Sequence, residues 1–252
     1  MNQHALNTEI EAFIHQKDKA KEAYSEADKQ YIARFGGAGG QGSKGASGEG
    51  LLYEFFTPDY ICELMWMLAK RYGYNSKGTV LEPSLGTGNF LKWAPDLSKC
   101  YGFEINPTSK RICEILYPEA KIYEGYFETA FLQAPRFTQR LKSPLTWLGG
   151  FPFSLVIGNP PYGKYKNTYS SYFPKPKMHQ IELFFMYYSL QLLKPGGLLV
   201  FITGSNFLRN GISYQGEKME LEKLCDLVDA YRLPPVFSST KVPTDIIVLK
   251  RK

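Results

Sequence analysis

A short apolar run that ends in two consecutive prolines constrains the fold of this chain most strongly. The run Leu155–Ile157 is followed directly by residues 158–162, Gly-Asn-Pro-Pro-Tyr. Apolar and β-branched residues bounded by glycine and proline are typical of a buried strand, and paired prolines exclude both a helix and a sheet ladder directly afterwards. The sequence therefore predicts a core strand that ends in a rigid loop. In open α/β sheets, ligands bind at that edge.

The groups of this loop suit a planar nitrogen that is a poor nucleophile. The side-chain oxygen of Asn159 and the carbonyl of Pro160 can each accept one N–H of an exocyclic amine, and the Pro161 carbonyl likewise has no competing N–H beside it. Tyr162 can stack on an aromatic ring, which is worth about 1–3 kcal/mol per base in nucleic-acid sites. Judged alone, the segment is equally typical of an ordinary turn.

Composition limits the classes of protein to which the chain can belong. Its 252 residues, 44% of them hydrophobic, suffice for one substantial α/β domain with an appendage. No apolar run approaches the roughly 20 residues that span a bilayer, so we expect no membrane role and a cytoplasmic location. The 4 cysteines are scattered and only 3 histidines are present, which favours reduced thiols and no metal. The net charge of +6 permits a polyanionic partner.

Three segments follow from the pattern along the chain. Residues 1–35 carry apolar side chains at helical spacing and predict one or two surface helices. Residues 36–50 are dominated by glycine, which is typical of a flexible linker, and a mobile flap over the ligand site is the alternative. Residues 51–252 contain the remaining strand and helix patterns and predict the catalytic domain.

Two strand ends in this third segment predict a nucleotide-type pocket. A strand at 79–81 runs into Glu82 and a turn with Gly86 and Gly88, after which a helix is expected, and glycines there let the backbone pass close to a ligand. An acidic strand end would repel a pyrophosphate and favour a cationic amino-acid group. A second strand, 100–103, ends at Glu104, where an acid usually holds ribose hydroxyls, and Ile105 can pack on an adenine face. Before these strands, Thr57 is expected to cap a helix that has Pro58 at its first position.

Together, these motifs resemble the S-adenosylmethionine-dependent amino-methyltransferases, most closely the N6-adenine DNA methyltransferases, over residues 51–252. The resemblance assigns Asn159, Pro160 and Tyr162 to catalysis. It implies a cofactor site for S-adenosylmethionine made of Thr57, Glu82, Ser84, Gly86, Gly88, Asn89, Phe90, Glu104, Ile105 and Phe127. It places Phe237, from the pair Val236-Phe237, against a flipped adenine, beside Pro161. The fold implied is a Rossmann-like, seven-stranded, mostly parallel sheet of the class I methyltransferases, with helices on both faces and the last strand antiparallel between its neighbours.

Two regions extend or depart from this family pattern. Where the family often has an Asp before Phe to hold the adenine amine of the cofactor, this chain has Tyr126 before Phe127, so Glu128 or the backbone must take that part. The loop 163–177 interleaves basic and aromatic residues, among them Lys164, Tyr165 and Lys166, which suits phosphate contacts and base stacking; a solvated loop is the alternative.

The expected reaction is transfer of a methyl group to the N6 amine of an adenine flipped out of DNA. Three alternatives stay open: methylation of a protein glutamine, whose enzymes share the Asn-Pro-Pro-Tyr loop, methylation of adenine in RNA, and an inactive methyltransferase-like module that binds nucleic acid. The glycine-rich segment before Phe56-Thr57-Pro58 also resembles the methylase portion of large phage and mobile-element proteins that carry a helicase. A specificity or helicase domain is accordingly expected as a partner, separate or in the same longer protein.

Overall fold

The computed structural model of the chain describes residues 3–36, 56–132, 152–166, 169–173, 175–208, 214–237 and 243–252. The strands are β1 (Val80–Glu82), β2 (Cys100–Glu104), β3 (Lys121–Glu124), β4 (Phe153–Gly158), β5 (Leu193–Gly204), β6 (Cys225–Arg232) and β7 (Thr244–Arg251). The α-helices are α1 (Gln3–Ala20), α2 (Glu26–Ile32), α3 (Asp59–Arg71), α4 (Pro107–Leu116), α6 (Ile181–Leu192) and α7 (Gln215–Glu222). Short 3-10 helices are η1 (Leu91–Trp93), η2 (Leu97–Lys99), η3 (Phe127–Phe131) and η5 (Ser170–Tyr172).

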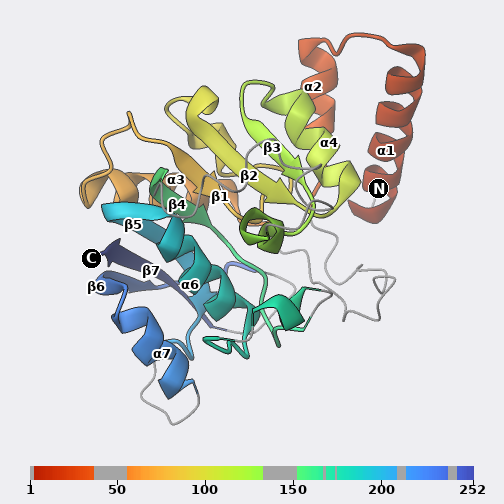
Figure 1. The fold of residues 1–252 in the computed structure, drawn as a ribbon. Coiled ribbons are helices and arrows are strands. Elements are labelled where there is room, and N and C mark those ends of the chain that lie inside the picture. The colour runs from red at the N-terminus through yellow and green to blue at the C-terminus, as the bar shows by residue number, and fades with distance from the viewer. Residues whose placement is uncertain are drawn as a thin grey trace.

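The strands form one seven-stranded sheet in the order β3-β2-β1-β4-β5-β7-β6 (Figure 1). The first five strands pair in parallel, and β7 pairs antiparallel with both β5 and β6. The predicted mostly parallel sheet, with its last strand inserted between two neighbours, is therefore confirmed. The carboxyl ends of β1, β2, β4 and β5 consequently meet at one edge.

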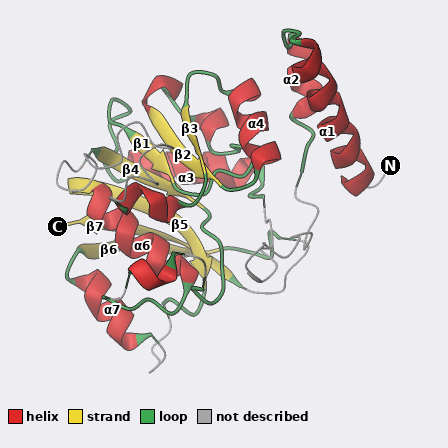
Figure 2. Ribbon diagram, turned by 45° about the vertical axis from the view of Figure 1, so that its right-hand side comes forward, coloured by secondary structure: helices red, strands yellow, loops and turns green. Residues whose placement is uncertain are grey.

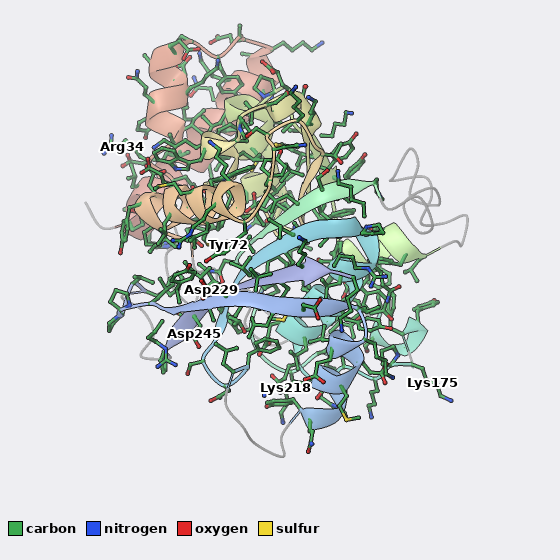
Figure 3. The ribbon with its side chains drawn as sticks, turned by 90° about the vertical axis from the view of Figure 1, so that its left-hand side faces the viewer. Arg34, Tyr72, Lys175, Lys218, Asp229 and Asp245 are labelled. Carbon is green, nitrogen blue, oxygen red and sulfur yellow. The ribbon has the colours of Figure 1, made fainter. Side chains whose placement is uncertain are left out.

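Side chains alternate between two apolar layers because successive residues of a strand point to opposite faces of the sheet. Leu198, Val200 and Ile202 of β5 pack in the layer that includes α3. Leu199 and Phe201 pack in the other layer, with α6. Helices thus cover both faces, as predicted (Figure 2). At the β6 edge, Tyr72 after α3 donates a hydrogen bond to Asp229, which ties helix and sheet together (Figure 3).

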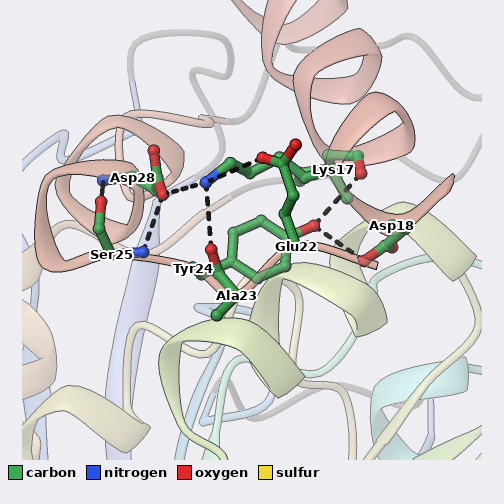
Figure 4. A network of polar contacts seen from close by, with 8 residues as sticks. Lys17, Asp18, Glu22, Ala23, Tyr24, Ser25 and Asp28 are labelled. Atoms are coloured by element: carbon green, nitrogen blue, oxygen red, sulfur yellow. Dashed lines mark hydrogen bonds and ion pairs between the residues drawn. The ribbon is translucent and has the colours of Figure 1, made fainter. Parts of the chain in front are cut away.

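The N-terminal segment forms a helical hairpin, α1 and α2, beside α4 at the β3 side of the sheet (Figure 1). Its second helix begins with a capping box, in which Ser25 accepts from the Asp28 amide and Asp28 accepts from the Ser25 amide. Lys17 of α1 pairs with Asp28 at 2.5 Å and also donates to the Ala23 carbonyl (Figure 4). The expectation of one or two helices in residues 1–35 is confirmed as two.

Two local predictions were wrong. Thr57 does not cap α3: the helix begins at Asp59, and its N-cap is Pro58, which is extended and makes no side-chain cap hydrogen bond. No α-helix follows the glycine turn directly; only η1 forms there, and Ala94 after it is extended because it precedes Pro95.

Residues 194–197 lie inside β5, where the pairing with β4 is irregular. Phe153 of β4 pairs with Leu193, whereas Leu155 pairs with Leu198, so the four residues between these partners are displaced from the ladder. Gly196 has a φ of +76°, which glycine adopts without strain. Most of the predicted linker or flap, residues 37–50, lies outside the described residues. Within the described ranges, no helix combines the length and apolarity that a membrane span requires.

Candidate active site

Two acidic residues and the Asn-Pro-Pro-Tyr loop meet at the carboxyl edge of the sheet. Glu82 ends β1, Glu104 ends the neighbouring β2, and Gly158 ends β4 on the other side of β1. The Gly158 backbone lies so close to β1 that a Cβ there would be 3.5 Å from Cγ of Glu82. The sheet order therefore brings the predicted cofactor strands and the predicted catalytic loop side by side.

Glu82 is a buried acidic residue at this edge. Its side chain is buried, with 2% of its surface exposed, and its Oε2 atom has no hydrogen-bond partner. Burial, and secondarily the negative charge of Glu104, raises the pKa of this carboxyl well above its usual range. Glu82 lines a hollow, and a buried carboxyl oxygen without a partner in the chain is a candidate to accept a hydrogen bond from a ligand or to pair with a cation.

Glu104 is held by the glycine turn. Its Oε2 accepts the Gly86 amide at 2.7 Å, and its Oε1 accepts the Asn106 amide at 2.7 Å. A carboxylate oxygen can accept more than one hydrogen bond, for example from a hydroxyl group. Gly86 itself has a φ of +56°, and a Cβ at this position would lie 2.9 Å from Cε1 of Phe56. A side chain is thus excluded here by both conformation and space.

Hydrogen bonds to buried carbonyls hold the wall of a first hollow beside Glu82. Asn89 donates from Nδ2 to the Thr57 carbonyl at 2.9 Å, and Trp66 donates from Nε1 to the Phe90 carbonyl at 2.8 Å. These bonds join α3 to the segment after the glycine turn. Around this first hollow lie Phe56, Thr57, Glu82, Ser84, Leu85, Gly86, Thr87, Asn89, Phe90 and Asn159.

The Asn-Pro-Pro-Tyr loop is tied to the first hollow and to itself. Ser84 donates from Oγ to the Asn159 carbonyl at 3.3 Å, and the Tyr162 hydroxyl donates to Oδ1 of Asn159 at 2.5 Å. Burial raises the pKa of Tyr162, so its hydroxyl keeps the proton that it donates. This bond fixes the rotation of the Asn159 amide, whose Oδ1 atom, like any amide oxygen, can accept more than one hydrogen bond.

A second hollow borders the same loop at Tyr162. Its lining comes from the loop, the start of α6, the segment after β5 and the start of α7, namely Tyr162, Gln180, Glu182, Leu183, Gly204, Asn206, Phe207, Tyr214 and Lys218. Two hydrogen bonds connect the loop to α6. The Ile181 amide donates to the Gly163 carbonyl at 2.8 Å, and Glu182 accepts from the Gly163 amide at 3.3 Å. Aromatic rings and polar groups are therefore mixed around the second hollow.

Several predicted site residues lie elsewhere. Gly88 serves helix packing, because a Cβ there would be 2.8 Å from the Tyr117 ring. Ile105 is 40% exposed and does not line the first hollow. Phe127 is buried in the apolar layer, 5.7 Å from the Phe103 ring and 5.2 Å from the Phe185 ring. The Glu128 side chain is buried as well.

The predicted substrate residues differ in their exposure. Lys164 and Lys166 are exposed beside the catalytic loop, whereas the Tyr165 ring stacks on Phe184 at 4.1 Å and so has one face occupied. Phe237 is buried in the same apolar cluster against which Tyr162 packs. Pro161 is half-buried between Asn159 and Tyr162 in the loop.

Sequence reasoning missed the lining of the second hollow. Asn206 and Phe207 lie just after the end of β5. Because ligands bind at the carboxyl ends of parallel strands, this position could have identified them from the sequence. Gln180 and Glu182 lie at the start of α6, where only the folded chain brings them to Tyr162. Within the described residues, no cluster of three or more acidic, histidine or cysteine side chains is arranged to hold a metal ion.

The sheet order and the carboxyl-edge site define a class I methyltransferase fold. Residues 98–237 match the family described as Eco57I restriction-modification methylase, and the chain belongs to that family.

The chain spans only a small part of the curated protein to which it is similar. The chain is 29% identical over 230 residues to "Defense against restriction protein B" of Escherichia phage P1; the match covers 90% of this chain and 9% of that protein. The structure is similar, with a TM-score of 0.59 and 19% identity, to the methyltransferase subunit of a type I restriction-modification system from Streptococcus thermophilus, over 79% of this chain and 45% of that one. A complex of DrdV with DNA gives a TM-score of 0.66 at 14% identity, over 92% and 30% of the two chains.

Proposed function

We propose that this chain transfers a methyl group from S-adenosylmethionine to the N6 amine of adenine in DNA, with the target base flipped out of the duplex. The observation that carries the proposal is that one loop borders two hollows. Asn159 lines the hollow that contains the buried Glu82, and Tyr162 lines the hollow of aromatic and amide groups. Membership of a restriction-modification methylase family supports DNA as the substrate.

Three features of the first hollow support S-adenosylmethionine as its ligand. Glu82 has an unpartnered buried oxygen for the ammonium group, and the oxygens of Glu104 can accept from ribose hydroxyls. Gly86, which has no room for a side chain, brings the backbone close to the ligand. When bound, the cofactor supplies an activated methyl group on a sulfonium.

The second hollow supports a base as the acceptor. Tyr162, Phe207 and Tyr214 provide aromatic rings, and stacking on such rings offsets the cost of unstacking a base, which is a few kcal/mol. Oδ1 of Asn159 and the carbonyl of Pro160 accept the two N–H groups of the amine, so its lone pair turns toward the first hollow. The protein acts mainly through alignment, which can supply about 7–11 kcal/mol of the barrier.

DNA sequence recognition is assigned, within this proposal, to a further domain or subunit. This assignment is supported by the curated relative, of which the chain covers 9%, and by the methyltransferase subunit of a multi-subunit restriction system among the similar folds. The exposed Lys164 and Lys166 would contribute phosphate contacts without sequence preference.

Replacing Asn159 by Ala tests the catalytic part of the proposal. The variant loses the side-chain acceptor for the amine, whereas Glu82, Glu104 and Gly86 are unchanged. We expect methylation to fall by at least about 100-fold, which corresponds to roughly 2.7 kcal/mol of lost transition-state stabilisation. The dissociation constant for S-adenosylmethionine, measured by calorimetry, should change less than about threefold, because less than 0.7 kcal/mol of binding is affected. Methylation retained by this variant would refute the role of Asn159.

A further inference from the structure

We propose that the N-terminal hairpin helps to form the cofactor pocket, because Phe35 positions Phe56 against the glycine turn. The inference rests on the proposed function, since it takes the first hollow to be the S-adenosylmethionine site. The path has three links: α4 holds the hairpin, the hairpin holds Phe35, and Phe35 supports Phe56.

The hairpin is bound to α4 by an apolar cluster and an ion pair. Buried side chains of both segments share this cluster, namely Ile10, Ile14, Ile32, Phe35, Ile112 and Ile115. Arg111 of α4 makes a two-pronged contact with Asp18 of α1, with Nε to Oδ2 at 2.8 Å and Nη2 to Oδ1 at 2.6 Å. The Tyr24 hydroxyl also donates to Asp18 at 2.9 Å (Figure 4). The hairpin therefore has a defined seat on the domain.

Asn7 fixes the backbone where the chain leaves the hairpin. Its side chain is buried, and Nδ2 donates to the Gly36 carbonyl at 2.7 Å while Oδ1 accepts the Gly36 amide at 3.2 Å. This paired contact holds the residue next to Phe35. Phe35, which follows the end of α2 at Ile32, is itself buried, with 8% of its surface exposed.

Phe56 connects this cluster to the pocket. Its ring centroid lies 6.4 Å from that of Phe35, and it packs against the cluster formed by the hairpin and α4. The same ring lines the first hollow and lies against Gly86, where an added Cβ would be 2.9 Å from its Cε1 atom. One face of Phe56 is thus supported by the hairpin while another forms a pocket wall. Without Phe35, the wall loses its support.

Cofactor binding by Phe35→Ala, measured by calorimetry with S-adenosylmethionine, tests this coupling. Because an aromatic contact of this kind is lost, Phe35→Ala should raise the dissociation constant for S-adenosylmethionine about threefold to tenfold. Phe13→Ala is the matched control: Phe13 packs in the same cluster, and its ring contacts Tyr31 at 5.4 Å inside the hairpin, so its loss leaves Phe56 supported. The control should bind within about twofold of the unmodified chain.

Two further measurements separate positioning from general loss of structure. Phe35→Leu, which restores apolar volume, should recover part of the lost affinity. Without cofactor, hydrogen exchange of the Gly86 amide, which donates to Glu104, should be faster in Phe35→Ala than in Phe13→Ala. If Phe35→Ala unfolds, Asn7→Ala, which releases the Gly36 backbone next to Phe35, takes its place in the comparison with Phe13→Ala.

The outcomes distinguish the two proposals. Equal affinity and equal Gly86 exchange in the Phe35 and Phe13 variants would overturn the coupling and leave the proposed function intact. Failure of the unmodified chain to bind S-adenosylmethionine would overturn the proposed function and this inference with it. Weaker binding confined to the Phe35 and Asn7 variants would establish the hairpin as part of the cofactor site.

Discussion

Replacing Glu82 by Gln should change how the stability of the protein depends on pH. The buried carboxyl has a folded-state pKa well above its usual 4.5, because burial and the neighbouring Glu104 disfavour its charged form. Between the unfolded and folded pKa values, the folded state binds one more proton than the unfolded chain. The free energy of unfolding therefore falls by up to about 1.4 kcal/mol for each pH unit above the unfolded pKa, until the folded pKa is passed. A glutamine carries no such proton.

The stability advantage of Glu82→Gln over the unmodified chain should thus grow as pH rises. Urea unfolding at pH 5, 6 and 7 measures this difference, and contributions from other titrating groups cancel in the comparison. Glu63→Gln is a suitable control, because Glu63 is exposed on α3 and its replacement should leave the pH profile parallel to that of the unmodified chain. Parallel profiles for Glu82→Gln as well would refute the assignment of a proton to this buried carboxyl.

Three other changes follow from the same geometry. Binding of S-adenosylmethionine should release a proton from Glu82, so its affinity should increase with pH up to the folded pKa; calorimetry in buffers of different ionisation enthalpy measures the release, which Glu82→Gln should abolish. Changing Lys164 and Lys166 together to Ala should reduce the slope of log DNA affinity against log salt concentration by about 1.8, and an unchanged slope would exclude phosphate contacts by these lysines. Gly102→Ala places a Cβ 2.5 Å from Cγ of Leu85 beneath the glycine turn and should destabilise the fold by about 1–3 kcal/mol in chemical unfolding; no loss would show that Leu85 can repack.

The strands of the parallel part of the sheet, and the positions of the acidic strand ends and of the Asn-Pro-Pro-Tyr loop, were predictable from local patterns. Apolar runs bounded by glycine, proline or an acid marked β1, β2 and β4, and Glu82, Glu104 and the 158–162 segment stand at their carboxyl ends as expected. The antiparallel seventh strand followed only from resemblance to a family, since a strand pattern carries no direction.

Contacts between distant segments account for what was missed. Phe127 comes shortly after a strand that ends in Glu124, which is a typical position for a cofactor-binding residue. Its ring instead packs on Phe103 and Phe185 in the apolar layer. Thr57 precedes a proline in a typical capping pattern, but Pro58 is extended and the Thr57 carbonyl accepts from Asn89, so the helix begins later. Such outcomes depend on packing partners that lie far away in sequence.

Transfer of labelled methyl from S-adenosylmethionine tests the central claim most directly. Unmethylated genomic DNA, RNA and a glutamine-bearing release-factor protein are offered in parallel, and the products are identified after digestion. The account predicts label in DNA as N6-methyladenine, which disappears when Asn159 is replaced by Ala. Label in the protein alone, as methylated glutamine, would contradict it and assign the site to an amide substrate.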